Sequence, residues 1–487
     1  MLRLKALTRF PGIHMIKDKA PAPTSPLPAR TPRGPRGSLL LGVMPEVRRD
    51  VLNFLLRVRS EYGDVARYRL GTLNAYLISH PDGVRRVLQE NVKNYTKDHF
   101  SYRMVSWVMG NGLISSQGSF WLRQRRLAQP AFHKNRIAAM GRLMTEATRE
   151  MMQQWESHAA SGEPLSIVRE MMQLTLRVLG DTLFGLSVTP HAETVARSFE
   201  VMNEQIITRG RNLQLLPPVL PTRYDRELRA AIRALDTVVY NIIAERRRSN
   251  EDSGDLLSMF ILARDDETGE KMDDKQLRDE VLTMLFAGHE TTATTLSWAW
   301  ALLDQHPAEE ARLHAELDEV LGGRLPTVED LPRLPYTRMV MEETLRLYPP
   351  AYVYSRKVQQ DDVIGGYQIP AGSLVDISPW VTHRHPDFWE APDTFRPERF
   401  SAEQVAQRSR SAYFPFSYGP HQCIGNNFAM MEAQLILASV AQHYRLRCVP
   451  GYQPTPEPLI TLRPKGGLPM LLQRRSSKAV TAHAWQR

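Results

Sequence analysis

The stretch FSYGPHQCIG, residues 416–425, places a cysteine between glycines and beside a histidine, directly before a long apolar helical pattern. Cys423 in this setting has four interpretations: an inert buried thiol, half of a disulfide, a nucleophile or a metal ligand. Cys448 is the only other cysteine, and a helix expected over about 424–444 would hold the two roughly 30 Å apart. The chain contains no CxxC pair of the kind that zinc sites use. A thiol nucleophile is possible, with His421 nearby, but its catalytic base normally comes from elsewhere in the chain.

Metal ligation is the interpretation that the surrounding residues favour. Gly419 and Gly425 remove side chains from the loop, as expected where a flat molecule lies against its backbone. The start of a helix favours a thiolate, through its dipole and its free N–H groups. A thiolate on such a loop suits ligation of haem iron, whereas the inert thiol describes Cys448 better.

A second chemical pattern lies inside a long predicted helix. Asp273 or Asp274 caps this helix, and His306-Pro307 ends it. Its centre, LFAGHETTATT, is apolar or small and must cross the core, yet it contains a glycine, an acid and several hydroxyls. A mid-helix glycine costs about 1 kcal/mol relative to alanine, and hydroxyls can bend the helix. The pattern indicates either a molecule held against this turn or a kinked packing helix.

Composition limits the classes that remain. The chain has 487 residues, a net charge of +9 and two cysteines, which favours a reducing compartment. Its mixed basic surface suits an acidic partner protein or weak membrane contact, rather than nucleic acid, and no apolar run is long enough to span a bilayer. We expect a cytoplasmic protein. The alternative is mitochondrial, if residues 1–17 are a transit peptide.

The chain divides into three parts. Residues 1–37 read as a disordered, basic, proline-rich leader, 38–473 as a single domain, and 474–487 as a flexible tail. Helical periodicity dominates the domain, and short strand patterns cluster near its ends. The predicted fold class is therefore mainly α with a small β region.

Five motifs, in this order, resemble the cytochrome P450 superfamily. They are Trp121-Leu-Arg-Gln-Arg125, the AGHETT turn at 287–292, Glu343-Thr-Leu-Arg346, PERF at 397–400 with Arg399, and FSYGPHQCIG. The chain is identified as a bacterial-type soluble member, with a long central helix over haem b. The resemblance makes Cys423 the proximal thiolate ligand of the iron, which would push electron density onto the metal.

The resemblance also assigns roles to other residues. The cofactor-binding residues would be Trp121, Arg125, Ala287, Gly288, Arg356, Phe416, His421 and Gly425. Glu290 and Thr291 would be the catalytic acid–alcohol pair, with Glu290 relaying protons through water and Thr291 donating a hydrogen bond to dioxygen. Ala287 and Gly288 would leave space for dioxygen, and His289 would point away. The pairs among Glu343, Arg346 and Arg399 would fix the loop that carries Cys423.

The implied reaction inserts one oxygen atom from O2 into a lipophilic substrate: a fatty acid, a terpenoid or a steroid. A separate ferredoxin or flavodoxin, with its reductase, would supply electrons to a monomeric enzyme. The basic residues that would steer this partner to its docking face are Arg123, Arg126, Lys134 and Arg136. The expected distal pocket includes the 97–114 loop, 206–220, Phe286, 351–354 and 459–462. The alternatives are an H2O2-dependent peroxygenase on this fold, a non-catalytic haem sensor or carrier, and a haem-free scaffold.

Overall fold

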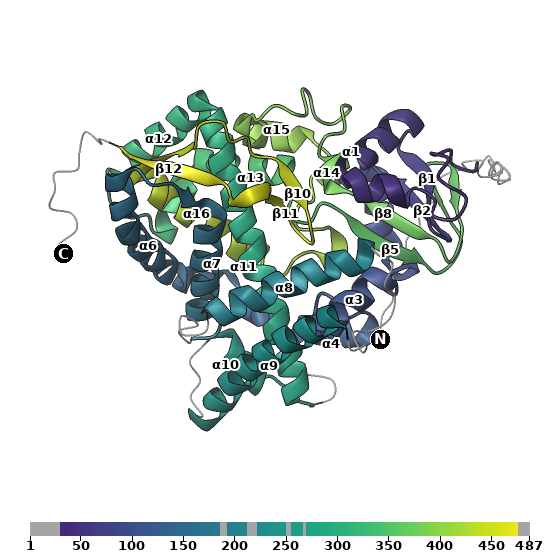
Figure 1. Cartoon of the computed structure of the whole chain (residues 1–487), viewed down its shortest axis with the longest axis horizontal. Helices are drawn as coiled ribbons and strands as arrows, with labels where there is room; N and C mark the ends of the chain where they lie inside the picture. The colour runs from purple at the N-terminus through teal and green to yellow at the C-terminus, as the bar shows by residue number, and fades with distance from the viewer. Residues whose placement is uncertain (1–29, 186–191, 212–221, 250–254, 266–268, 476–487) are drawn as a thin grey trace, which may run out of the picture.

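The computed structural model describes residues 30–185, 192–211, 222–249, 255–265 and 269–475 (Figure 1). Helices dominate it: α1 (Met44–Tyr62), α2 (Pro81–Arg85), α3 (Phe100–Met109), α4 (Gly118–Ala128), α5 (Lys134–Ala139), α6 (Gly141–Ser161), α7 (Ile167–Leu183), α8 (Ala192–Arg211), α9 (Arg223–Ser249), α10 (Leu256–Leu262), α11 (Asp274–Gln305), α12 (Pro307–Leu321), α13 (Pro335–Leu347), α14 (Pro379–Thr382), α15 (Ala402–Gln407) and α16 (Asn426–His443). The prediction of a mainly α fold with a small β region is confirmed.

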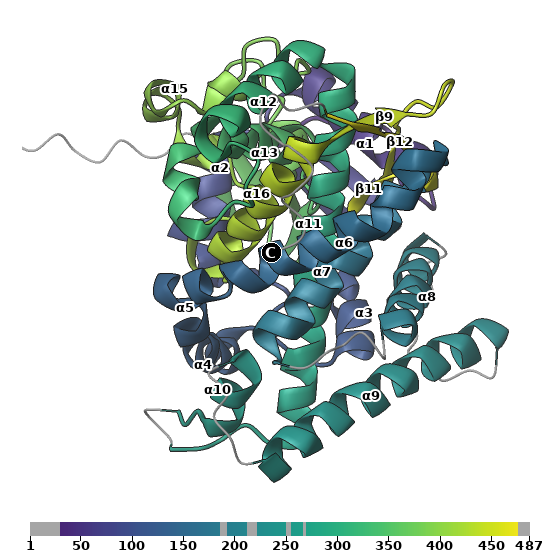
Figure 2. The ribbon, with the colours of Figure 1, turned by 90° about the vertical axis from the view of Figure 1, so that its left-hand side faces the viewer.

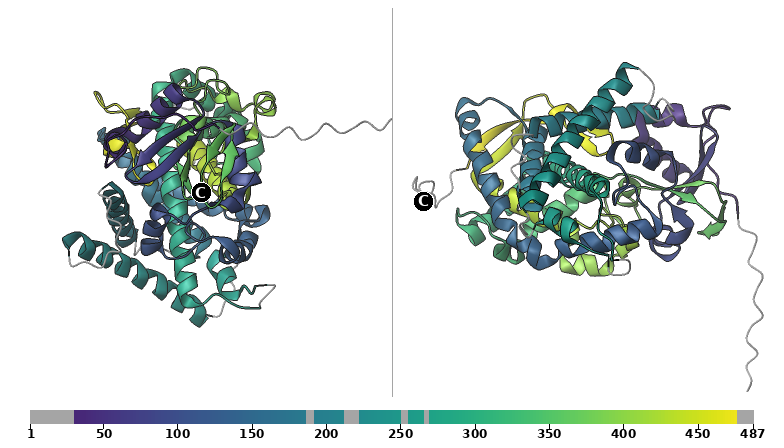
Figure 3. Two further views of the ribbon diagram at one scale, coloured as in Figure 1. Left: turned by 90° about the vertical axis from the view of Figure 1, so that its right-hand side faces the viewer. Right: turned by 90° about the horizontal axis from the view of Figure 1, so that it is seen from below.

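The strands are short and form separate small sheets. They are β1 (Val65–Leu70), β2 (Leu73–Ile78), β3 (Tyr95–Thr96), β4 (Leu165–Ser166), β5 (Tyr354–Val358), β6 (Asp362–Ile364), β7 (Tyr367–Ile369), β8 (Leu374–Ile377), β9 (Tyr444–Cys448), β10 (Pro456–Pro458), β11 (Leu462–Pro464) and β12 (Pro469–Arg474). The largest sheet has the order β1-β2-β8-β5-β3, in which only the β2–β8 pair is parallel. This sheet lies at one side of the molecule, which faces the viewer in the left panel of Figure 3.

The central helix α11 forms where the sequence predicts it. The Asp273 side chain accepts a hydrogen bond from the backbone N–H of Gln276 at 2.7 Å, and the helix ends before His306. Most residues of α11 are buried, and the buried residues occupy all faces of the helix. The helix therefore runs through the core and not along the surface. Figure 2 shows α11 behind α7 and α6, with α9 extending away from the helical body.

Close packing on α11 explains one of its small residues. A Cβ atom on Gly288 would lie 2.6 Å from a methyl carbon of Leu179 on α7. That separation is far below van der Waals contact, so a larger residue at position 288 would force the Leu179 side chain to move. Gly288 therefore has a packing role in addition to any role toward a ligand.

Residues near both expected boundaries of the domain make backbone contacts with it. Arg30 forms a β-bridge with Tyr367, and the N–H of Arg67 donates to the carbonyl of Arg33 at 2.9 Å. Residues 30–37, expected within the leader, are thus bound to the domain because their backbone groups pair with β1 and β7. At the other end, the N–H of Arg475 donates to His443 at 2.8 Å. The rest of the leader and residues 476–487 of the tail lie outside the described residues.

None of the helices within the described ranges is both long enough and apolar enough to cross a membrane.

Candidate haem-thiolate site

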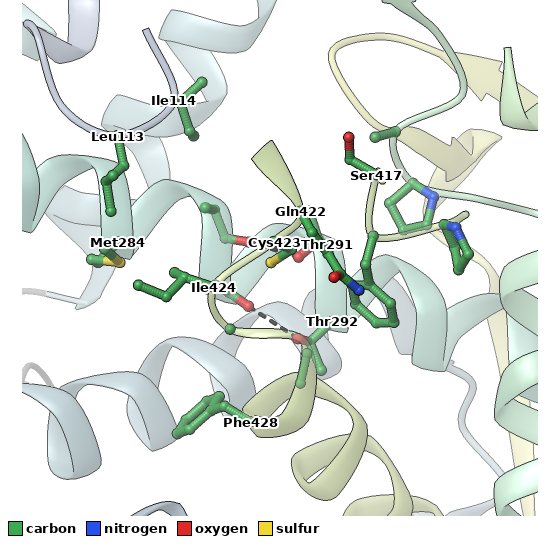
Figure 4. A pocket seen from close by; sticks show the side chains of 18 of the residues that line it. Leu113, Ile114, Met284, Thr291, Thr292, Ser417, Gln422, Cys423, Ile424 and Phe428 are labelled. Carbon is green, nitrogen blue, oxygen red and sulfur yellow. Dashed lines mark hydrogen bonds between the residues drawn. The ribbon is translucent and has the colours of Figure 1, made fainter. Parts of the chain in front are cut away.

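A cavity of about 310 Å³ lies between α11 and the loop that precedes α16. Residues from distant parts of the sequence line it: Lys97 and Tyr102, Trp121 and Arg125, the 287–295 face of α11, Tyr354 and Arg356, and the 415–425 loop. Figure 4 shows Cys423 on that loop and Thr291 on α11 at the same cavity. The core folds around this space, which places a single thiol opposite the central helix.

The backbone of the 416–425 loop is fixed on the side away from the cavity. Gly419 has φ of +70°, and a Cβ there would lie 2.2 Å from the carbonyl oxygen of Leu88, so only glycine fits. The N–H of Cys423 donates to the carbonyl of Phe416 at 2.8 Å, which closes the loop. At Gly425 a Cβ would lie 4.0 Å from Cys423 Sγ, an ordinary contact. Glycine there leaves room on the cavity side.

Cys423 and Cys448 are both free, so the structure forms no disulfide between them. Among the described residues, no group of three or more His, Cys, Asp or Glu side chains could hold a metal ion. Cys423 would therefore act as a lone thiolate, the kind of protein ligand that holds haem iron in haem-thiolate enzymes. Burial raises the pKa of its thiol, while the N–H of Gly425 and the charge of Arg125 act in the opposite direction. A coordinated cation deprotonates such a thiol outright.

One end of the cavity is strongly basic. Lys97, Arg125, Arg356 and His421 line it, and none of the described lining residues is an aspartate or glutamate. Burial, followed by repulsion from Arg356, lowers the pKa of Lys97 to about 7. Its ammonium donates to the carbonyls of Leu113, Ile114 and Ser116. These basic side chains would be stabilised by a bound dianion.

His421 and Trp121 lie together at this basic end. Their ring centroids are 4.0 Å apart. Burial lowers the pKa of His421 to about 3, with further lowering by Lys97, Arg356 and Arg125. The imidazole is thus neutral, and its buried Nδ1 has no hydrogen-bond partner among the described residues. A neutral ring with an unsatisfied nitrogen is suited to donate to a carboxylate of a bound ligand.

The two predicted arginines meet this end from separate elements. Arg125, on α4, donates to the carbonyl of Gln422 at 2.8 Å, which ties it to the cysteine loop. Arg356, on β5, is buried and donates to the hydroxyl of Tyr102 at 2.8 Å. A flat tetrapyrrole with two carboxylates fits this arrangement, since Cys423 would hold its iron and the basic cluster would bind its carboxylates.

The α11 wall of the cavity carries hydroxyls. Ala287, Gly288, Thr291, Thr292 and Thr295 all line it. Thr291 Oγ1 donates to the carbonyl of Ala287 at 2.6 Å, and Thr292 Oγ1 donates to Gly288 at 3.1 Å, the bond drawn in Figure 4. Both hydroxyls keep acceptor lone pairs that can receive a proton or a hydrogen bond. The wall thus presents small side chains and short polar groups to any ligand.

Glu290 does not line the cavity. One of its oxygens accepts a hydrogen bond from the Asn203 amide at 2.8 Å, and the other accepts from the Thr461 hydroxyl at 2.6 Å. The carboxyl is almost fully buried, and it links α11 to α8 and to the turn between β10 and β11. To deliver a proton to the cavity, this side chain must release at least one of the two bonds.

Two neighbours of Glu290 also face away from the cavity. His289 packs against Phe199 with ring centroids 5.2 Å apart, and its Nδ1 lies 2.8 Å from the carbonyl of Leu285. Phe286 packs on the same Phe199 ring at 5.6 Å. His289 was expected to point away. Phe286 and the 459–462 segment were expected at the pocket, but neither is among its lining residues. Phe286 packs on Phe199 of α8, and Thr461 of the segment bonds to Glu290.

A buried ionic network supports the cysteine loop. Glu343 receives hydrogen bonds from Arg346 at 2.7 and 2.8 Å, and Arg399 lies 3.3 Å from it. Arg346 also donates to the carbonyl of His383 at 2.9 Å, and the His383 ring accepts from the N–H of Phe414 at 3.0 Å. The network therefore reaches the chain two residues before Phe416.

Comparison with known proteins agrees with this geometry. The family model for cytochrome P450 matches residues 32–469. The chain belongs to the cytochrome P450 family. This P450 is 39% identical over 88% of its length to two proteins of Streptomyces melanosporofaciens, cyclooctatin synthase and cyclooctat-9-en-7-ol 5-monooxygenase, and covers 92% and 93% of them. Pentalenene oxygenase of Streptomyces avermitilis is 31% identical, with 86% of this chain and 91% of that protein covered.

The fold agrees as well. The crystal structure of the cytochrome P450DA heme domain matches 93% of this chain and 99% of its own, with a TM-score of 0.84 at 26% identity. The predictions of a P450 fold, a haem cofactor and a haem-thiolate monooxygenase are confirmed. A P450 needs a redox partner, and this one takes a lipophilic substrate.

The predicted docking cluster for that partner is partly engaged within the protein. Arg126 pairs with the buried carboxylate of Asp265 at 3.1 Å, and Arg123 lies 3.9 Å from the same carboxylate. Arg136 lies against Met259, while Lys134 is exposed. Arg123 and Arg126 thus connect α4 to the segment after α10. The spacing of residues along the sequence did not predict these ion pairs.

Lys97 and Tyr102 lie in the expected 97–114 pocket loop, but no individual role was predicted for either residue. Each belongs to a segment without a recognised motif, and both join the site only because β3 pairs with β5 and brings the 97–102 stretch to Arg356. An isolated lysine in a polar stretch is normally a solvated surface residue. The signal that the sequence did offer was the place of both residues within the expected 97–114 pocket loop.

Proposed function

We propose that this P450 oxygenates a compact cyclic terpenoid, either a hydrocarbon or its alcohol. The site supports the proposal through one arrangement: a single thiol faces the hydroxyl-bearing wall of α11 across a cavity whose remaining lining is mostly apolar. Apolar pockets select by shape and exclude water. Two of the relatives have names that denote oxidation of cyclooctat-9-en-7-ol and of pentalenene, and the proposal extends that substrate class to this chain.

In this proposal the cofactor is haem b, held by Cys423 on one face and by the basic cluster at its edge. The bound haem supplies the activation of O2. Trp121, Arg125, Arg356 and His421 would orient its carboxylates, and Lys97 would join them. Phe416 and Gly425 would lie against the ring beside the thiol, and Ala287 and Gly288 would lie on the opposite face.

The protons that the reaction consumes would pass along α11. Thr291 has its hydroxyl at the cavity and its own proton directed at Ala287. The Thr291 hydroxyl would donate into the cavity once another donor takes its place at the carbonyl of Ala287. We keep Glu290 as the acid of the pair, released from Asn203 or Thr461 before it can serve the cavity.

The electrons would come from a ferredoxin or flavodoxin through its reductase, with Lys134 and Arg136 at the contact. The enzyme would act as a monomer in the cytoplasm, where free thiols such as Cys423 and Cys448 persist. We further propose that residues 38–473 remain the catalytic unit, joined by the bound residues 30–37.

One experiment tests the thiolate and the substrate class in sequence. Reduction with dithionite followed by carbon monoxide should give a Soret band well to the red of His-ligated haem, and Cys423→Ala should abolish that band. Cyclic terpenes should then shift the spin state of the resting enzyme at lower concentrations than fatty acids or steroids. A His-type band, or a stronger response to linear fatty acids, would contradict the proposal. Product formed with H2O2 alone, and none with reductase, would favour a peroxygenase.

A further inference from the structure

Helix α4 carries two sets of polar side chains on different faces. Trp121 and Arg125, four residues apart, line the cavity, and Arg125 donates to the carbonyl of Gln422 at 2.8 Å. Arg123 and Arg126, three residues apart, reach the segment that follows α10. A rotation or a shift of α4 would therefore move both sets of side chains together.

Few apolar contacts hold α4 in place. Of its residues, only Gln124, Leu127 and Ala128 are buried. The side-chain amide of Gln124 has no hydrogen-bond partner within the described part of the chain. Phe120 and Leu122 are 37% and 48% exposed. The position of α4 therefore depends on its polar contacts more than on packing.

A buried carboxylate on the segment after α10 supplies such a contact. The side chain of Asp265 is 1% exposed, and it pairs with Arg126 at 3.1 Å and lies 3.9 Å from Arg123. Asp265 is itself fixed, because its N–H donates to the carbonyl of Glu270 at 3.0 Å and its carbonyl accepts from the N–H of Gly269 at 2.7 Å. Figure 2 shows α4 beside α10. A closed turn thus holds one face of α4 through a single buried acid.

Loss of this charge would leave Arg123 and Arg126 without a buried counter-ion, and their repulsion would then act on α4. We propose that Asp265 is a positioning residue for the haem. Its pairs with the two arginines fix the orientation of α4, and α4 in turn places Trp121 and Arg125 at the haem carboxylates. This inference rests on the contacts with those carboxylates that the proposed function includes. Asp265 is not among the described lining residues of the cavity, so it acts through α4 and not by contact.

The first measurement is the rate of haem dissociation from the full-length, haem-loaded enzyme, with excess apomyoglobin to capture the released haem. Asp265→Asn keeps the size of the side chain and removes its charge. It should speed haem loss about tenfold or more, the worth of one hydrogen bond to a charged group. The matched control is Glu270→Gln, on the same turn, where the side chain is 71% exposed and 3.8 Å from Arg123. It should change the rate far less, because exposed pairs contribute little.

A double-mutant cycle shows whether Asp265 acts through Arg125. Arg125→Gln should also speed haem loss about tenfold or more. Adding Asp265→Asn to Arg125→Gln should then cause little further loss, because the contact through which Asp265 acts has already been removed. Arg126→Gln, at a side chain that is 37% exposed, provides a second cycle with a milder change.

The reduction potential of the haem separates positioning from the direct effect of the Asp265 charge. Removal of a negative charge near the haem would by itself stabilise the reduced iron and raise the potential. Movement of the Arg125 guanidinium away from the haem carboxylates would lower the potential. Asp265→Asn should therefore lower the potential, with the same sign as Arg125→Gln, and Glu270→Gln should leave it unchanged.

Three results would overturn the proposal. The first is haem loss from Asp265→Asn at the rate of the unaltered enzyme. The second is a pair of effects that multiply in the double variant, or a raised potential in Asp265→Asn, either of which would show that Asp265 does not act through Arg125. The third is no effect of Arg125→Gln, which would overturn the proposed carboxylate contact as well. An effect of Arg125→Gln without one of Asp265→Asn would overturn this inference alone. The carbon monoxide spectrum confirms that each variant keeps its thiolate ligand.

Discussion

Glu343→Gln is the substitution that most directly tests the support of the cysteine loop. Glu343 is fully buried and receives two hydrogen bonds from Arg346, one from the N–H of Arg396 at 2.9 Å, and an ion pair from Arg399. Glutamine keeps the shape but removes the charge, which leaves two buried guanidinium groups without a counter-ion. Breaking a buried pair in this way costs about 3–5 kcal/mol, a large part of a typical stability of about 5–15 kcal/mol.

Urea unfolding measures this cost, followed through both the Soret band and tryptophan fluorescence. The unfolding midpoint of Glu343→Gln should fall strongly with an unchanged slope, and haem should be lost at lower urea than in the unaltered enzyme. Glu390→Gln is the control, because Glu390 pairs with Arg396 at 2.9 Å but its side chain is 83% exposed. Such a pair is worth about 1 kcal/mol or less. Equal midpoint shifts in the two variants would refute the reasoning.

Three further predictions follow from contacts along α11. Gly288→Ala should destabilise the fold by about 1–3 kcal/mol through overpacking on Leu179, and should cost less in a Leu179→Ala background; additive losses would count against packing as the cause. Thr291→Ala should lower product formed per reduced nicotinamide by about tenfold or more, with the remainder appearing as peroxide, whereas Thr295→Val should keep its coupling; equal coupling in both would remove Thr291 from proton delivery. Burial raises the pKa of Glu280 to about 8 in the folded state, from 4.5, so folding takes up a proton between these pH values and stability falls as pH rises through them. Glu280→Gln should therefore gain stability relative to the unaltered protein as pH rises from 4.5 to 8, measured by urea midpoints; a constant difference would show that the folded carboxyl titrates normally.

Local features were predictable because local chemistry determines them. The start of α11 follows from the side chain of Asp273, and α16 follows from a mainly apolar helical pattern after Cys423. The glycines around Cys423 predicted a loop with a bare face toward a ligand; Gly425 lines the cavity, whereas Gly419 is required by its close approach to the backbone of Leu88. In each case the residues that determine the structure are close together in sequence, or the constraint acts on the backbone of one residue.

The direction of a side chain was not predictable in the same way. Glu290 turns toward Asn203, 87 residues before it, and toward Thr461, 171 residues after it. Periodicity places Glu290 on a face of α11 but does not say which element will offer a donor there. Arg123 and Arg126 likewise found Asp265, and their expected freedom to meet a partner protein was reduced. Long-range polar pairing depends on the packed tertiary structure, which a single sequence does not reveal.

The basic end of the cavity has a consequence for how the protein is made. Lys97, Arg125 and Arg356 converge there without a lining carboxylate among the described residues, so repulsion among their positive charges opposes closure of the empty chain. A ligand that binds only the folded state adds stability in proportion to the logarithm of its concentration. The yield of folded protein in a cell should therefore follow the supply of haem during synthesis. A host starved of iron would accumulate chain that is open to proteolysis, even though its gene and its translation are unchanged.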